Sequence, residues 1–166
     1  MSGKTIGLNL NHGFAGSYAR QPDMIINTRP NKDTTDIVFG RAVVKAVGGV
    51  ANATASVTAA DFVGVAAFQV ETQLNYLDQN AGGTYVPDAP VSVFQRGRIN
   101  VLCKLGNPEV YAPVYIATAA DATSGTEIGD FQADATNGVL LPNCQWGGTK
   151  DGNNVAELVI LSAVNA

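Results

Sequence analysis

The stretch VSVFQRGRINV, residues 91–101, decides how the centre of the chain folds. Two β-prone runs flank Arg-Gly-Arg, so the stretch is either a hairpin with a basic tip or one long strand. The apolar residues stay on odd numbers on both sides of the glycine, and both arrangements give that phase. Three-residue hairpin loops usually place glycine last, whereas Gly97 is central. The pattern therefore favours one long strand bent at Gly97, with Arg96 and Arg98 on its outer, polar face.

The composition of the chain indicates one all-β domain. Of its 166 residues, 46% are hydrophobic, 14% are charged and 18 are glycine, and runs typical of helices are few. We expect about seven strands in a β-barrel or a jelly-roll-like sandwich. The clearest strand candidates are residues 37–47, 62–70, 91–101, 110–119 and 155–164. Thr58 and Asp61 have the spacing of a cap for one helical turn before residue 62.

Residues 1–35 differ in composition and hydrophobic pattern from residues 36–166. The first segment is rich in Asn, Gly, Arg and Pro, and its apolar residues follow no period of 2 or 3.6. It is nevertheless too apolar for a solvated tail. We expect an extended N-terminal arm that orders against another surface, and a β-domain that folds without it. The residues expected to bind a partner are Phe14, Tyr18, Arg20, Met24, Ile25, Ile26, Arg29, Arg96 and Arg98.

Charge, hydropathy and cysteine usage limit the possible partners. The net charge of −4 and the pI of about 4.7 argue against nucleic acid, which needs a clustered basic face. No apolar run approaches the ~18 residues that cross a membrane, and residues 1–10 lack the apolar run of a signal peptide. Without an export signal, Cys103 and Cys144 are expected to be buried free thiols rather than a disulfide.

Catalytic and cofactor-binding motifs are not found in the sequence. One histidine, His12, and two distant cysteines do not make a zinc site, and no Walker loop, dinucleotide fingerprint or HExxH is present. Carboxylates such as Asp130 and Asp134, or Glu71 and Glu157, could form a pair only in space. We expect no enzyme and no cofactor. The alternatives are a secreted or surface β-sandwich module that binds a carbohydrate or a protein, and a small hydrolase.

Three segments, in this order, resemble the structural cement proteins of tailed bacteriophages. They are GFAGSYARQPDMIINTR (13–29), IVFGRAVV (37–44) and PVSVFQRGRINV (90–101). VYAPVYIA (110–117) and TSGTEIGDF (123–131) are similar to the same pattern. The resemblance implies a noncatalytic β-domain on the outer capsid surface of the virion, made in the host cytoplasm. It would bind the major capsid protein and bridge neighbouring subunits against internal DNA pressure.

A homo-oligomer is also expected, a trimer first and a dimer second. The weakly charged β runs at 37–47 and 155–164 would otherwise leave exposed edges, and capsid sites are symmetric. Arg96 and Arg98 are expected to contact an acidic patch on a capsid subunit or on a sister copy.

Overall fold

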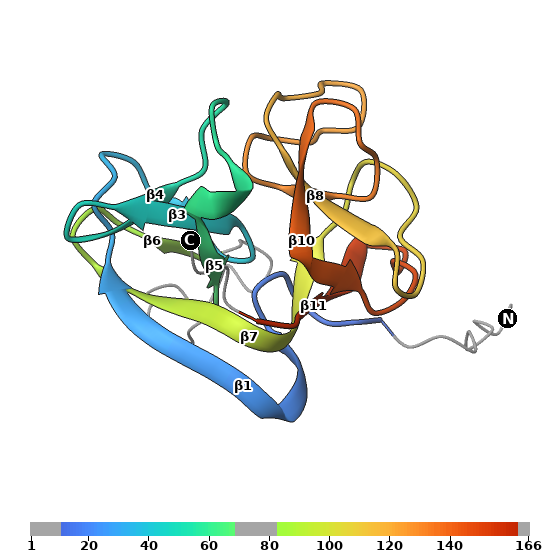
Figure 1. The fold of residues 1–166 in the computed structure, drawn as a ribbon, viewed down its shortest axis with the longest axis horizontal. Helices are drawn as coiled ribbons and strands as arrows, with labels where there is room; N and C mark the ends of the chain where they lie inside the picture. Colours follow the sequence, from blue (N-terminus) through green and yellow to red (C-terminus); the bar gives the residue numbers. More distant parts are fainter. Residues whose placement is uncertain (1–10, 69–82, 163–166) are drawn as a thin grey trace, which may run out of the picture.

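The computed structural model describes residues 11–68 and 83–162, which form a strongly curled β-structure (Figure 1). The strands are β1 (Tyr18–Pro30), β2 (Ile37–Val38), β3 (Ala42–Ala46), β4 (Gly49–Asn52), β5 (Phe62–Ala66), β6 (Thr84–Tyr85), β7 (Pro90–Leu102), β8 (Pro113–Ala117), β9 (Phe131–Gln132), β10 (Gly138–Trp146) and β11 (Val155–Ile160). A single turn of 3-10 helix, η1 (Ala59–Asp61), precedes β5. The all-β class expected from the composition is confirmed.

The main sheet has nine strands in the order β4-β3-β5-β7-β11-β10-β8-β9, with β1 paired to β7 off this path. It curls into an incomplete barrel, with β3, β4 and β5 at one side and β8 and β10 at the other (Figure 1). β2 and β6 pair separately. The expected jelly-roll arrangement is not confirmed by this pairing.

The long central strand predicted from residues 91–101 is confirmed, because β7 runs unbroken through the glycine. Gly97 has a φ of 109°, and the strand bends there. Phe94 and Ile99 both enter the main core cluster although one number is even and the other odd. The alternation of faces therefore shifts by one residue at Gly97. Contrary to the expectation, Arg96 and Arg98 do not share one outer face.

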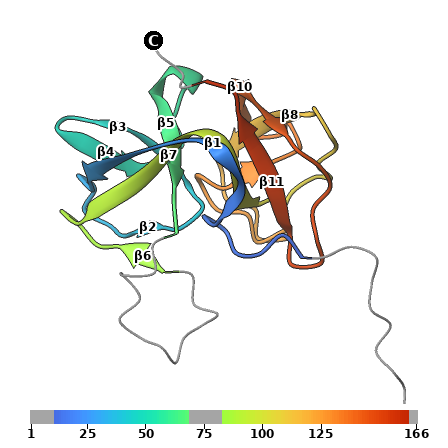
Figure 2. The same ribbon diagram turned by 90° about the horizontal axis from the view of Figure 1, so that it is seen from below.

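The strand of the N-terminal segment, β1, lies on the chain's own sheet (Figure 2). β1 runs antiparallel to β7, from Tyr18 opposite Ile99 to Pro30 opposite Pro90. Met24 in this strand packs against the main core cluster, as does Ile26. A separate N-terminal arm is thus not confirmed. The register of β1 shifts at three places, and such bulges remove the period of 2 that identifies a strand in a sequence.

The longer strand in each of the two runs expected to leave exposed edges is an internal strand. β11 lies between β7 and β10, and all six of its residues are buried. β3, from the other run, lies between β4 and β5. Burial on both faces explains why five of the six residues of β11 are apolar, with Glu157 the exception. The sheet edges therefore give no support to an oligomer formed through these two runs.

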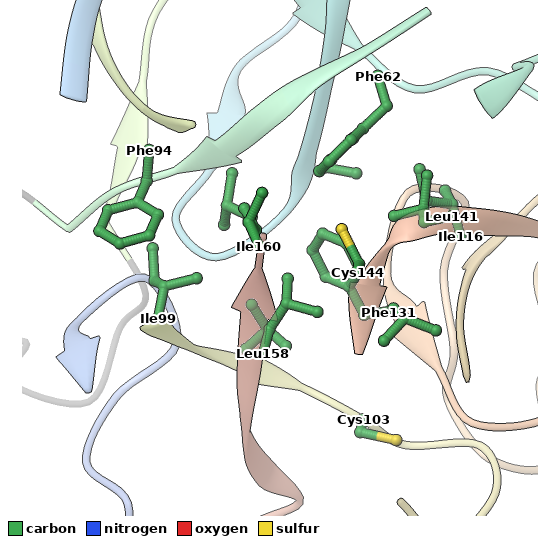
Figure 3. Close-up of a cluster of buried hydrophobic side chains, with 14 of the residues drawn as sticks. Phe62, Phe94, Ile99, Cys103, Ile116, Phe131, Leu141, Cys144, Leu158 and Ile160 are labelled. Carbon is green, nitrogen blue, oxygen red and sulfur yellow. The ribbon is translucent and has the colours of Figure 1, made fainter. Parts of the chain in front are cut away.

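The main core lies inside the curl of the sheet (Figure 3). Leu158 and Ile160 of β11 contribute to the same cluster as Phe94 of β7 and Leu141 of β10. A second cluster forms around Tyr85, whose hydroxyl donates to the carbonyl oxygen of Ala67 at 2.6 Å. Both clusters contain residues of β3, β5 and β7.

The two cysteines are buried free thiols, as expected (Figure 3). Burial raises the pKa of the Cys103 thiol to about 11, although the positive charge of Lys150 opposes the shift. Burial also raises the pKa of the Cys144 thiol to about 12. Both side chains therefore act as apolar packing groups at neutral pH.

The helical turn predicted from Thr58 and Asp61 is confirmed. The carboxylate of Asp61 accepts hydrogen bonds from the Thr58 backbone N–H at 3.1 Å and from its hydroxyl at 2.6 Å. The turn redirects the chain into β5. Residues 69 and 70 of the expected strand at 62–70 lie outside the described residues.

Candidate functional site

The nine residues expected to bind a partner lie along two paired strands and the turn before them. Phe14 is in the turn before β1, six residues from Tyr18 to Arg29 are on β1, and Arg96 and Arg98 are on β7. We call the paired β1 and β7 the β1–β7 ribbon. Its strands are far apart in the sequence but adjacent in both ribbon views (Figures 1 and 2).

The apolar side chains of this group divide into exposed and supporting ones. Phe14 is 63% exposed, Ile25 is 48% exposed and Tyr18 is 40% exposed. The Tyr18 ring also stacks on Phe94, with 5.9 Å between ring centroids. Met24 and Ile26 are half-buried against the core. The first three side chains are thus available to a partner, whereas the last two hold β1 on the domain.

The two arginines of β7 have different surroundings. Arg96 pairs through Nε with Oδ1 of Asp23 at 3.2 Å, and both side chains are largely exposed. An exposed pair of this kind contributes about 0–1 kcal/mol to stability. Arg98 instead pairs through Nη1 with Glu157, a buried residue of β11. Arg98 is therefore held by the fold, and Arg96 is a surface cation.

Glu157 fixes two guanidinium groups at once. Arg98 donates to its Oε1, and Arg20 of β1 donates from Nε to its Oε2 at 3.1 Å. Burial alone would raise the pKa of Glu157, but the hydrogen bonds and charges of Arg98 and Arg20 hold it below its ordinary value of 4.5. A Cβ on Gly147 would lie 2.6 Å from Oε1 of Glu157, so glycine leaves room for this carboxylate. The cluster ties β1, β7 and β11 together.

A surface recess opens beside this cluster. Its lining residues are Arg20, Arg98, Val110, Tyr111, Gln145, Trp146, Gly147 and Val159. Tyr111 is 75% exposed and has a φ of 66°. This backbone conformation costs about 1–3 kcal/mol for a side chain that is not glycine. The sequence pattern placed Tyr111 in a β run, and no local signal of a left-handed residue was present.

The acidic residues considered for catalysis have structural partners. Asp130 is buried and pairs with Arg41 at 3.3 Å and with Lys104 at 3.2 Å. Asp134 accepts a hydrogen bond from the Thr136 backbone N–H within its own turn. Glu71 lies outside the described residues. In residues 11–68 and 83–162, no group of three His, Cys, Asp or Glu side chains could hold a metal ion.

No helix in the described part of the chain has the length and hydropathy to cross a membrane. The described residues form an all-β structure with an exposed strand ribbon and an arginine-lined recess. The family model "Structural cement protein (E217 gp24/Pam3 gp6)" matches residues 3–161. The chain therefore belongs to the phage structural cement protein family, and the resemblance noted in the sequence is confirmed.

The fold is shared with a phage capsid structure. A chain of the structure titled "The capsid of Myoviridae Phage XM1" has a TM-score of 0.71 and 20% sequence identity to this one. The similarity covers 99% of this chain and 98% of that chain. A search of curated proteins found no match. Family membership gives the chain a structural, capsid-stabilising class and a place in the virion.

Proposed function

We propose that the chain binds the outer surface of the major capsid protein lattice and stabilises the head by bridging neighbouring subunits. The family match over residues 3–161 is the observation that carries this proposal. The pI of about 4.7 suits a surface that faces away from the packaged DNA. Many copies bound to one lattice reinforce one another, so each contact can be modest.

The β1–β7 ribbon supports this function with an accessible surface. Burying the exposed parts of Phe14, Tyr18 and Ile25 on a partner would contribute roughly 1 kcal/mol each. Among the described strands, β1 pairs with β7 alone, so its other edge suits strand addition by a capsid segment. Arg29 and Arg96 add exposed positive charge to the ribbon, for which an acidic capsid patch is the matching surface.

The oligomeric state belongs to the same proposal, with a trimer preferred over a dimer. The symmetry of capsid sites supports a small homo-oligomer. Light scattering on the purified chain and on decorated heads measures it. A strict monomer in both settings would overturn the oligomer while leaving capsid binding open to its own test.

A sedimentation assay with heads that lack this chain tests the function. We expect saturable co-sedimentation, and decorated heads that resist heating better than undecorated ones. Ile25→Asp places a charge on the exposed face of β1 and should weaken binding. Val47→Asp is the matched control, because Val47 is 99% exposed in the turn between β3 and β4. Absence of saturable binding by the unaltered chain would overturn the proposal.

A further inference from the structure

Tyr111 has an exposed ring on a strained backbone. Four non-glycine residues in the described chain have a positive φ, and the other three are Asp88, Asn137 and Asn154. Asn and Asp adopt this conformation readily, whereas a bulky tyrosine does so rarely. The Tyr111 backbone N–H donates to the carbonyl oxygen of Trp146 at 2.8 Å, but the ring itself is mostly in solvent. The strained backbone therefore presents the ring without serving core packing.

The neighbours of Tyr111 around the recess include two oriented cations. Arg20 and Arg98 line the same recess, and Glu157 fixes one N–H group of each. A guanidinium has five N–H donors, so most donors of both arginines remain for a ligand. The buried carboxylate holds the two side chains in place before any ligand arrives, which reduces the entropy lost on binding.

The charge around the recess favours one carboxylate over a polyanion. Two arginines and one Glu157 leave one uncompensated positive charge at the cluster. Glu109 is exposed near Tyr111, and the whole chain has a net charge of −4. A row of phosphates would be repelled by this surrounding charge, whereas a single Asp or Glu side chain matches it. Val110, 56% exposed, adds an apolar wall beside the ring.

We propose that this recess binds an acidic segment of the major capsid protein, with an Asp or Glu carboxylate on Arg20 and Arg98 and apolar atoms under Tyr111. The inference rests on the proposed function and adds the chemistry of the partner segment. Arginine and tyrosine are the residue types that concentrate binding energy at protein interfaces. The strained residue and the oriented arginines are then parts of one binding site.

Substitution of Tyr111 separates binding from folding. Tyr111→Gly removes the ring and relieves the positive φ, so the melting temperature should stay the same or rise. Binding to heads that lack this chain should weaken at least about tenfold, as expected for loss of an interface tyrosine. Tyr111→Phe should restore most of that affinity. Equal binding by Tyr111→Gly and the unaltered chain would overturn the proposal.

A charge variant tests the arginines with a matched control. Arg20→Gln should weaken head binding and reduce its salt dependence, because it removes one exposed cation of the recess. Lys45→Gln removes the same charge from β3, outside the recess, and should bind normally. Equal effects of the two substitutions would show that only net charge matters, which would contradict the site.

Photo-crosslinking from position 111 identifies the partner directly. With a benzophenone amino acid in place of Tyr111, decorated heads should yield a cross-link to a major capsid peptide that contains Asp or Glu. A cross-link to another copy of this chain or to DNA, or none on fully decorated heads, would overturn the proposal. If the unaltered chain does not bind heads, the proposed function fails and the recess assignment falls with it. If the unaltered chain binds heads and the recess variants bind equally well, the proposed function stands and the recess assignment alone fails.

Discussion

A Cβ on Gly97 would overlap the carbonyl oxygen of Asp23, so β1 can lie across the bend of β7 only when residue 97 is glycine. The φ of 109° at Gly97 excludes other residues for a second, independent reason. The contact joins β7, the long strand predicted from the sequence, to β1, which the sequence analysis did not predict as a strand. It therefore positions the whole β1–β7 ribbon.

Gly97→Ala should lower the free energy of unfolding by about 2–4 kcal/mol, since it combines a disfavoured φ with a steric overlap. Chemical denaturation measures this change. Gly48→Ala is the control, because Gly48 also has a positive φ but an added Cβ there meets nothing within 4 Å. It should cost only about 1–2 kcal/mol. Equal losses for the two variants would show that β1 does not press on residue 97.

Glu157→Gln should destabilise the fold near neutral pH by about 1.5–3 kcal/mol, because it weakens charged hydrogen bonds to Arg20 and Arg98. The folded pKa of Glu157 lies below its ordinary value of 4.5. Its stabilising contribution is therefore present above pH 4.5 and is lost as the pH falls through the folded pKa. The difference in stability between the unaltered chain and Glu157→Gln should shrink over the same acidic range.

Glu127→Gln provides the comparison for that titration. The hydrogen bond and charge of Arg41 lower the pKa of Glu127, but its side chain is 59% exposed. Solvent screens an exposed pair, so this variant should cost less than about 1 kcal/mol. A larger loss for Glu127→Gln than for Glu157→Gln would contradict the assigned role of the buried cluster.

The two thiols should be unreactive while the chain is folded. With pKa values of about 11 for Cys103 and about 12 for Cys144, thiolate is a very small fraction at neutral pH, and both groups are buried. A thiol-reactive dye should label neither cysteine in the native protein and both after denaturation. Reductant should not change the melting temperature. Labelling of one native cysteine, or a loss of stability in reductant, would contradict this packing.

Removal of the N-terminal segment tests whether β1 is part of the fold. The sequence favoured a β-domain that folds from Asp36 onward without residues 1–35. The pairing of β1 with β7 and the packing of Met24 and Ile26 predict the opposite. A variant starting at Asp36 should lose at least about 3 kcal/mol, which lowers the melting temperature by about 6–12 °C. A variant starting at Asn11 keeps β1 and is the control; an unchanged melting temperature from Asp36 would support an independent arm.

The sequence was most informative where local pattern and fold agree. The β-prone residues around a central glycine identified β7 as one strand, although not its change of face at Gly97, and the spacing of Thr58 and Asp61 identified η1. β1 was not predicted as a strand, because its bulges break the alternation of apolar and polar residues that identifies one. β10 was not among the clearest strand candidates, since Pro142 and Asn143 interrupt its apolar pattern, yet it is one nine-residue strand.

The candidate site could be predicted only where its residues are close together in the sequence. Seven of the nine expected residues come from one segment, so local composition could identify them. Glu157 joins Arg20 and Arg98 across three strands, and no local pattern predicts a meeting of distant side chains. Tyr111 is the third residue of a β-turn in which the Ala112 backbone N–H donates to the carbonyl oxygen of Glu109 at 3.0 Å. Its positive φ fits that position, but the sequence has tyrosine where glycine or asparagine usually marks such a turn. The recess therefore became visible only in three dimensions.

Cryo-electron microscopy of heads with and without this chain tests the central claim most directly. We predict added density on the outer surface, seated over contacts between neighbouring major capsid subunits, into which the curled sheet fits with the β1–β7 ribbon toward the capsid. The same density should be absent from heads that lack the chain. Density on the inner surface, or density that contacts only one capsid subunit without bridging two, would contradict the account.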